Sequence, residues 1–204
     1  YFNLYDFHNL YKELLNFCTL DLSAFYFDIR KDTLYCDNKS SKKRNSCIIT
    51  LNIILESLLK WFAPILSFTT EEIFTLVNNE NKSIHLENFI DIPEKFFNKK
   101  LNEKWIEIKK IRDICNISIE EKRASKLIGS SLEADLTINL NNKLIKSVEN
   151  VDFSEICITS FAKINKTSSN VVVANTRKAE GNKCPRCWKI FENICKRCED
   201  AKNK

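Results

Sequence analysis

Glycine is scarce in this sequence, since the 204 residues include only Gly129 and Gly181. A phosphate-binding loop needs several glycines close together, because its backbone must approach the phosphates closely. A nucleotide-binding fold built on such a loop is therefore excluded within this chain. Methionine is absent, and a helical pattern is already under way at Tyr1. We therefore expect the chain to be the C-terminal part of a longer polypeptide.

Long apolar runs and catalytic groupings of side chains are also missing. No stretch is long and apolar enough to span a membrane, and no signal peptide is visible. The two histidines, His8 and His85, have no nucleophile or acid partner in a known pattern, so we expect each at the surface or at a helix end. The residues of this chain therefore favour binding over catalysis, with no catalytic site and no membrane partner.

Cysteine is the residue with the most informative spacing. Two Cys-x-x-Cys pairs, Cys184 with Cys187 and Cys195 with Cys198, are separated by seven residues. Two such pairs are typical of a structural zinc site with four thiolates, because each short turn lets both sulfurs point at one ion. We expect one structural zinc ion on these four cysteines. The alternatives are an iron–sulfur cluster, a pair of disulfides or four ordinary buried thiols.

The remaining cysteines argue against disulfides. The total of nine is odd, and the other five have no pair spacing (Cys18, Cys36, Cys47, Cys115, Cys157). Scattered, unpaired cysteines are typical of a reducing compartment. We therefore expect a cytoplasmic protein whose two cysteine pairs bind metal.

Positive charge is concentrated near the two cysteine pairs. The formal net charge is +5, and residues 183–204 contain seven Lys or Arg against three Asp or Glu. A second basic run covers residues 39–44. Such clusters suit an anionic partner, nucleic acid first, although each run alone fits a solvated surface equally well. Trp188 and Phe191 are apolar neighbours that could cover the metal or stack on a base.

Helical periodicity dominates residues 1–125. Asp6 can cap a first helix, and residues 36–45 are expected to form a loop. A wide apolar stripe then predicts a central helix at 46–62 that is buried on most sides. Pro64 should end the central helix and bias Ala63 out of the helical region. Thr69 with Glu72 predicts a capping box for the next helix, which polar residues 78–81 would end. A long helix is expected at 96–124. This part is predicted to be an antiparallel helical bundle.

The pattern changes after Gly129. Strands are predicted at 136–140, 154–159 and 171–174, with a short helix at 141–149. We therefore expect a mainly α protein in three parts: a helical bundle at 1–125, a small α+β unit at 126–180 and a zinc finger with four cysteine ligands at 181–204.

Four segments resemble one family. Residues 183–188 with 195–198 are similar to the C-terminal zinc finger of bacterial-type isoleucyl-tRNA synthetases, and formamidopyrimidine-type DNA glycosylases end in a related finger. Residues 25–35, 61–72 and 128–134 resemble the synthetase alone: its "F-Y-x-D-x-x-K-D-x-x-Y" stretch, its "W-x-A-P-I-L-S-F-T-x-x-E" helix junction and its "G-S-L-E-A" linker. The resemblance runs from about residue 5 to residue 198. Many members have a longer stretch between the cysteine pairs, which puts any RNA contact of that loop in doubt.

The resemblance implies a fold and a role. The chain would be the anticodon-binding bundle and zinc finger of a class I enzyme that activates isoleucine with ATP and attaches it to its cognate tRNA. Its ATP-binding catalytic domain and its editing domain would precede Tyr1, and the parent enzyme would be monomeric. The alternative is a nucleic-acid-binding module of the DNA-repair glycosylase type. The candidate tRNA contacts are Arg186, Trp188, Lys183, Lys196 and Arg197 in the finger and Arg30, Lys31, Lys43 and Arg44 in the bundle.

Overall fold

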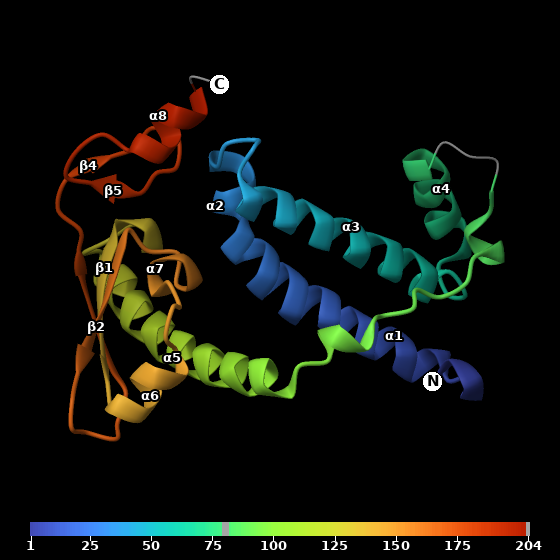
Figure 1. Ribbon diagram of the computed structural model, residues 1–204, viewed down its shortest axis with the longest axis horizontal. Coiled ribbons are helices and arrows are strands. Elements are labelled where there is room, and N and C mark those ends of the chain that lie inside the picture. The colour runs from blue at the N-terminus through green and yellow to red at the C-terminus, as the bar shows by residue number, and fades with distance from the viewer. Residues whose placement is uncertain (79–81, 203–204) are drawn as a thin grey trace. The chain divides into compact units, whose positions relative to one another are not determined.

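The computed structural model describes residues 1–78 and 82–202, which form two compact units. The helical unit comprises Tyr1–Phe96, and the sheet unit comprises Phe97–Lys204. Figure 1 traces both along the chain. The fold is mainly α with one small α+β part and a cysteine cluster, which confirms the predicted fold class.

The helical unit begins with three consecutive helical segments. A 3-10 turn at Phe2–Leu4 precedes α1 (Phe7–Asn16), a stretch with π-type hydrogen bonding (Phe17–Phe27) and α2 (Asp28–Cys36). The Asp6 carboxylate accepts a hydrogen bond from the Asn9 backbone N–H at 3.2 Å, so the predicted cap of the first helix is confirmed. The chain leaves α2 at Asp37, whose backbone is extended.

The next helix, α3 (Lys42–Phe62), begins earlier than predicted. Ser41 caps it, because its hydroxyl accepts a hydrogen bond from the Arg44 N–H, so the loop between α2 and α3 is shorter than the expected 36–45. The prediction that this helix is buried on most sides is wrong. Ile49 is 60% exposed and Ile53 is 46% exposed. Within the described residues of its unit, α3 packs mainly against α2 and α4, so part of its apolar surface stays uncovered.

The junction between α3 and α4 (Ser67–Asn78) corrects two further predictions. Ala63 keeps right-handed helical angles although Pro64 follows it, and the turn closes when the Leu66 N–H donates to the Phe62 carbonyl at 2.7 Å. Thr69 lies inside α4, so the capping box of Thr69 with Glu72 is wrong. The predicted polar end of this helix at 78–81 extends outside the described residues.

A small core closes this end of the helical unit. Leu59, Ala63, Phe74 and Ile84 are buried together, with Ile73 packed against them. Residues 82–98 are mostly irregular, with short 3-10 turns at Ile84–Leu86 and Glu94–Phe96. The Glu71 carboxylate fixes the first of these turns, because it accepts hydrogen bonds from the Ser83 hydroxyl at 3.0 Å and the Ile84 N–H at 2.9 Å.

The sheet unit is built from the long helix α5 (Lys99–Ala124) and a three-stranded sheet in the order β2-β1-β3. After a 3-10 turn at Ser131–Glu133, β1 (Ala134–Leu140) pairs in parallel with β2 (Phe161–Lys166) and antiparallel with β3 (Val173–Lys178). The short helices α6 (Asn142–Ser147) and α7 (Phe153–Ile156) connect β1 to β2. The core-facing residues of β1 are fully buried because α5 packs on this sheet.

The sheet unit both confirms and corrects the predictions. The strand at 136–140, the short helix after it and the long helix are confirmed. The prediction of a strand at 154–159 is wrong. Asp152 caps α7 there by accepting a hydrogen bond from the Ser154 N–H at 2.9 Å. The strand expected at 171–174 lies at Val173–Lys178, and β2 was not predicted.

The compact units also differ from the expected division of the chain. The predicted helical bundle at 1–125 included the long helix, whereas α5 packs on the sheet of the second unit. It stays a prediction that the ranges 1–125, 126–180 and 181–204 are three separate domains. The structure has no described helix that is both long and apolar enough to cross a membrane.

Candidate metal centre and nucleic-acid interface

The four cysteines predicted as metal ligands lie together in one element of the sheet unit. We name this the metal element: β4 (Asn182–Lys183), β5 (Ile190–Phe191), α8 (Lys196–Lys202) and the loops that join them. Cys184, Cys187, Cys195 and Cys198 are all buried, and their sulfur atoms lie within 4.8 Å of one another. No second such group of three or more metal-binding side chains occurs in the part of the chain that the structure describes.

The first cysteine pair sits on a tight turn between β4 and β5. These strands pair antiparallel, the Cys184 N–H donates to the Lys189 carbonyl, and the Trp188 N–H donates to the Cys184 carbonyl, each at 2.9 Å. Trp188 takes a left-handed backbone conformation with φ of 64°, which reverses the chain directly after Cys187. The turn therefore aims both sulfurs at the same side.

Gly181 is required at the base of this hairpin. Its φ of +126° is a conformation that side-chain-bearing residues rarely adopt. A Cβ atom at this position would also lie 2.4 Å from the Phe191 carbonyl oxygen. Gly181 therefore permits β4 and β5 to approach each other.

The second cysteine pair lies at the start of α8. The Cys198 N–H donates to the Cys195 carbonyl at 3.0 Å, so the chain turns into the helix between the two ligands. The Cys187 and Cys195 sulfurs, one from each pair, are 3.9 Å apart. A regular tetrahedron with metal–sulfur bonds of about 2.3 Å has sulfur–sulfur edges of about 3.8 Å. The cluster therefore has the dimensions of a four-thiolate metal site.

The thiols differ in their readiness to ionise. Burial acts to raise the pKa of Cys184, but the backbone N–H groups of Cys187 and Arg186 outweigh it and lower the pKa to about 7. Burial raises the pKa of Cys187, Cys195 and Cys198. A bound cation would offset this cost, because thiolates are the form that ligates metal.

The metal element is attached firmly to the sheet. The Ser160 hydroxyl, just before β2, accepts a hydrogen bond from the buried Ile190 N–H at 2.6 Å. The Glu133 carboxylate accepts a hydrogen bond from the Gly129 N–H at 3.0 Å and forms an ion pair with Lys183 at 3.7 Å. Neither Ser160 nor Glu133 was predicted as a site residue. Glu133 belongs to the "G-S-L-E-A" segment of the resemblance, and nothing in the sequence near Ser160 distinguished it.

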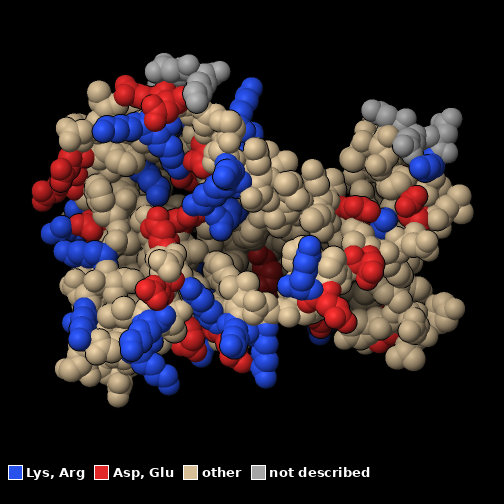
Figure 2. All heavy atoms as spheres, viewed as in Figure 1, with Lys and Arg blue, Asp and Glu red and all other residues tan. Residues whose placement is uncertain are grey.

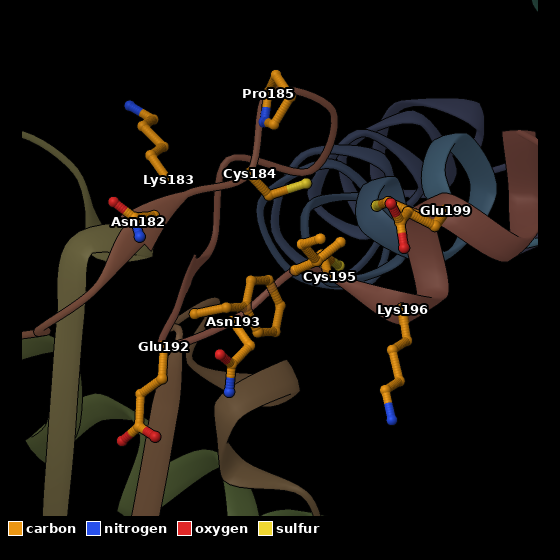
Figure 3. A pocket seen from close by; sticks show the side chains of 12 residues that line it. Asn182, Lys183, Cys184, Pro185, Glu192, Asn193, Cys195, Lys196 and Glu199 are labelled. Carbon is orange, nitrogen blue, oxygen red and sulfur yellow. The ribbon is translucent and has the colours of Figure 1, made fainter.

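The predicted tRNA contacts of the finger surround the metal site. Trp188 is 60% exposed, and the Lys183 ammonium lies 5.9 Å from the centre of its ring. This large exposure leaves the ring accessible for stacking. Arg186 and Arg197 are half-buried, and Lys196 is exposed at the start of α8. Figure 3 shows Cys184 and Cys195 at a hollow whose rim includes Lys183 and Lys196.

The predicted contacts of the bundle lie in the helical unit, around the ends of α2 and α3. Arg30 is half-buried over the Tyr26 ring, and Lys31 forms an ion pair with Asp28 at 3.0 Å. Lys43 is exposed in the first turn of α3. The Arg44 Nε donates to the Leu34 carbonyl at 3.1 Å, so this side chain ties α3 to α2. Arg30 and Lys31 thus lie near the start of α2, whereas Lys43 and Arg44 lie at the start of α3.

Basic and acidic side chains are mixed over the surface. On the face shown in Figure 2, Lys and Arg are more frequent over the sheet unit than over the helical unit, and Asp and Glu side chains are interspersed among the basic ones. The two histidines are exposed, as predicted, and a ring nitrogen of His85 lies 3.3 Å from the Ser67 carbonyl oxygen.

The chain is similar to known proteins over nearly its whole length. A family model described as the anticodon-binding domain of tRNA ligase matches residues 1–138. An isoleucine–tRNA ligase of Pelagibacter ubique is 68% identical over 98% of this chain and 22% of its own length. Isoleucine–tRNA ligases of Bartonella henselae and Agrobacterium fabrum are 39% and 37% identical over 93% and 95% of the chain, each covered over 21% of its own length. The chain thus spans about a fifth of the length of these relatives. Because the similarity to the Pelagibacter ligase covers 98% of the chain, it includes the metal element, which lies outside the residues that the family model matches.

Proposed function

The chain belongs to the family of anticodon-binding domains of tRNA ligases, and we propose that it is the tRNA-recognition end of an isoleucine–tRNA ligase. The observation that carries the proposal is the 68% identity to one such ligase over 98% of the chain. The whole enzyme would activate isoleucine with ATP and attach it to its tRNA, using catalytic and editing domains outside these residues. We also propose that it works in the cytoplasm, where its thiols would stay reduced.

We propose that the four cysteines hold one zinc ion. Four buried sulfurs within 4.8 Å of one another, with Cys187 and Cys195 at 3.9 Å, suit zinc, which structural sites bind through thiolates without an open position. The ion would supply structure and no chemistry of its own, because all four ligand positions are occupied by protein. Cys184, Cys187, Cys195 and Cys198 would together fix the hairpin of β4 and β5 against α8.

The metal element would present its basic and aromatic side chains to the anticodon loop. Lysine and arginine neutralise phosphates and position the RNA, whereas loop bases are read by stacking and by hydrogen bonds to their edges. Trp188 is the best candidate for stacking because its ring is exposed. The Lys183 ammonium lies over that ring, and Arg186 lies in the same turn between two of the cysteines. Lys196 and Arg197 would contact phosphates from the start of α8.

The helical unit would bind the anticodon stem through Arg30, Lys31, Lys43 and Arg44. Arg44 has a second task in this proposal, because its bond to the Leu34 carbonyl holds the corner between α2 and α3. Lys31 and Lys43 are the exposed members. Contacts to phosphates would place the RNA without reading its sequence, which leaves discrimination to the metal element.

A gel-shift comparison tests the proposal against the DNA-repair alternative. The full-length polypeptide that carries this chain is incubated with isoleucine tRNA, with duplex DNA of equal length and with neither. We expect tRNA binding at concentrations where duplex DNA is unbound. In the Arg186→Ala variant the affinity for tRNA should fall. The slope of its logarithm against the logarithm of salt concentration should become shallower by about 1, the value of one phosphate contact. Preferential binding to duplex DNA would contradict the proposal.

A further inference from the structure

One face of the three-stranded sheet carries no helix among the described residues of the sheet unit. Figure 1 shows the sheet nearly edge-on with α5, α6 and α7 on the same side of it. The side chains of β1 alternate, and Leu136 and Ile138, on the helix side, are fully buried. The Thr176 hydroxyl of β3 lies 2.9 Å from the Ser118 hydroxyl of α5, which places Thr176 on that same side. The alternate positions of all three strands therefore form the opposite, open face.

The strand register defines the open face as three rows of three residues. The row nearest the metal element follows Ser160, and the third row lies at the other end of the sheet. The rows are Phe161, Asp135 and Arg177; then Lys163, Thr137 and Asn175; then Asn165, Asn139 and Val173. All nine side chains are exposed or half-buried. The face is therefore polar over most of its area and is not a second apolar core surface.

Its charge is positive. The only acid among the nine is Asp135, and Arg177 neutralises it with two contacts to one carboxylate oxygen, at 2.7 Å from Nε and 2.6 Å from Nη2. That contact raises the pKa of Arg177. Lys163 has no ion-pair partner among the described residues. The nine residues thus carry one uncompensated positive charge.

Its hydrogen-bonding groups are unused. Within the described part of the chain, the side-chain amides of Asn139, Asn165 and Asn175 have no hydrogen-bond partner. Each amide offers two donors and one acceptor oxygen, which is the chemistry that pairs with the edges of nucleic-acid bases. Lys163 shares the middle row with Asn175, and the next row carries Asn165 and Asn139.

We propose that this open face is a second RNA-binding surface, which takes a single-stranded segment of the tRNA next to the nucleotides held by the metal element. The inference rests on the proposed function, which supplies the RNA. Interfaces with nucleic acid are more polar and more positive than those between proteins, whose cores are enriched in aromatic and other apolar residues. Only Phe161 and Val173 are large apolar residues among the nine. The composition therefore fits RNA and not a protein partner.

The second and third rows would carry the contacts. Glu180 and Glu192 line a hollow that also includes the row of Phe161, Asp135 and Arg177 together with Lys163 of the second row, so negative charge borders that end of the face. Lys163 would contact a phosphate, while Asn165 and Asn139 would meet base edges. The surface is held in a constant position relative to the metal element, because Ser160 joins β2 to β5.

A pair of matched variants tests the phosphate contact. Lys163→Ala removes the unpaired charge of the open face, whereas Lys143→Ala removes an exposed lysine of α6 that also has no partner among the described residues. In the full-length polypeptide we expect Lys163→Ala to weaken isoleucine tRNA binding about three- to tenfold, with a salt slope reduced by about 1. Lys143→Ala should leave both unchanged. Equal effects of the two variants would overturn the proposal.

Photo-crosslinking identifies what touches the face. Benzoylphenylalanine replaces Asn165 in the third row or, as a control, Ile117 on the exposed surface of α5. A crosslink from position 165 to tRNA, absent at position 117, supports the proposal. A crosslink from position 165 to protein, or none at all in a variant that binds tRNA, overturns it. If the unsubstituted polypeptide binds no tRNA, the proposed function fails as well. If it binds tRNA and Arg186→Ala weakens the complex, only the open-face proposal is at stake.

Discussion

The hydroxyl of Ser160 accepts a hydrogen bond from the Ile190 N–H at 2.6 Å and donates one to the Leu132 carbonyl at 2.5 Å. One buried side chain thereby links three segments: the turn before β1, the start of β2 and strand β5 of the metal element. The link explains how a small metal-binding hairpin can be held firmly on a neighbouring sheet. Its consequence for stability can be measured.

Ser160→Ala should destabilise the sheet unit. The substitution leaves the Ile190 N–H buried without its acceptor, and an unsatisfied buried donor costs about 1–3 kcal/mol. Denaturant unfolding followed by circular dichroism measures the loss. Ser168→Ala, at an exposed position, is the control and should change stability by less than about 0.5 kcal/mol. Equal stability of the two variants would show that the link contributes nothing.

Cys195→Ser should abolish metal binding. Removing one of four thiolates leaves an incomplete ligand set around the ion, and metal binding is coupled to folding of such elements. Metal analysis of purified protein is expected to give one zinc per chain for the wild type and close to none for the variant. Cys18→Ser, a thiol outside the cluster, controls for the loss of a cysteine and should keep the metal. Full zinc content in the Cys195→Ser variant would refute the assignment.

Gly181→Ala should weaken the metal site without touching a ligand. The new methyl group would meet the Phe191 backbone at 2.4 Å, and φ of +126° is strained for alanine. We expect about 1–3 kcal/mol lower stability and easier removal of the metal by a chelator. Gly129→Ala is the matched control, since its nearest neighbour would be the flexible Glu133 carboxylate at 3.7 Å. The idea fails if both variants release metal at the same rate.

Asp152 makes stability depend on pH. Burial acts to raise its pKa, but hydrogen bonds from the Ser154 side chain and N–H outweigh burial and lower it. A carboxylate with a lowered folded-state pKa stabilises the protein above the ordinary value of 3.8 and loses this effect as pH falls through the folded value. Asp152→Ala should cost about 1 kcal/mol at neutral pH and progressively less below pH 4. Unfolding curves at pH 7 and at low pH test this, and a cost that does not change with pH would contradict it.

The sequence revealed most where a pattern had a single physical solution. The spacing of the four cysteines was sufficient to predict their cluster, because two short turns can direct sulfurs only toward a common point. The Asp6 cap and the alternation of β1 likewise depend on local chemistry that neighbours reinforce. Strand β2 was missed because two of its three outward positions are Lys163 and Asn165, which lack the apolar and β-branched signal of a strand.

Other errors arose where tertiary contacts decide the outcome. The apolar stripe of α3 predicted burial, but periodicity states which residues share a face and not whether a neighbour covers it. Residues 154–159 are rich enough in β-branched residues to predict a strand. The Asp152 cap and the left-handed backbone of Ile158 instead make them a helix and a turn. Ser160 could not be selected, because its partner Ile190 lies thirty residues away along the chain.

The most direct test of the central claim compares two tRNAs that differ only in the anticodon. The full-length polypeptide is titrated with isoleucine tRNA and with the same tRNA carrying a replaced anticodon, with zinc present and at one salt concentration. We expect the replacement to weaken binding at least about tenfold, or about 1.4 kcal/mol, because the metal element would read the loop bases. Equal affinity for the two tRNAs would contradict the account.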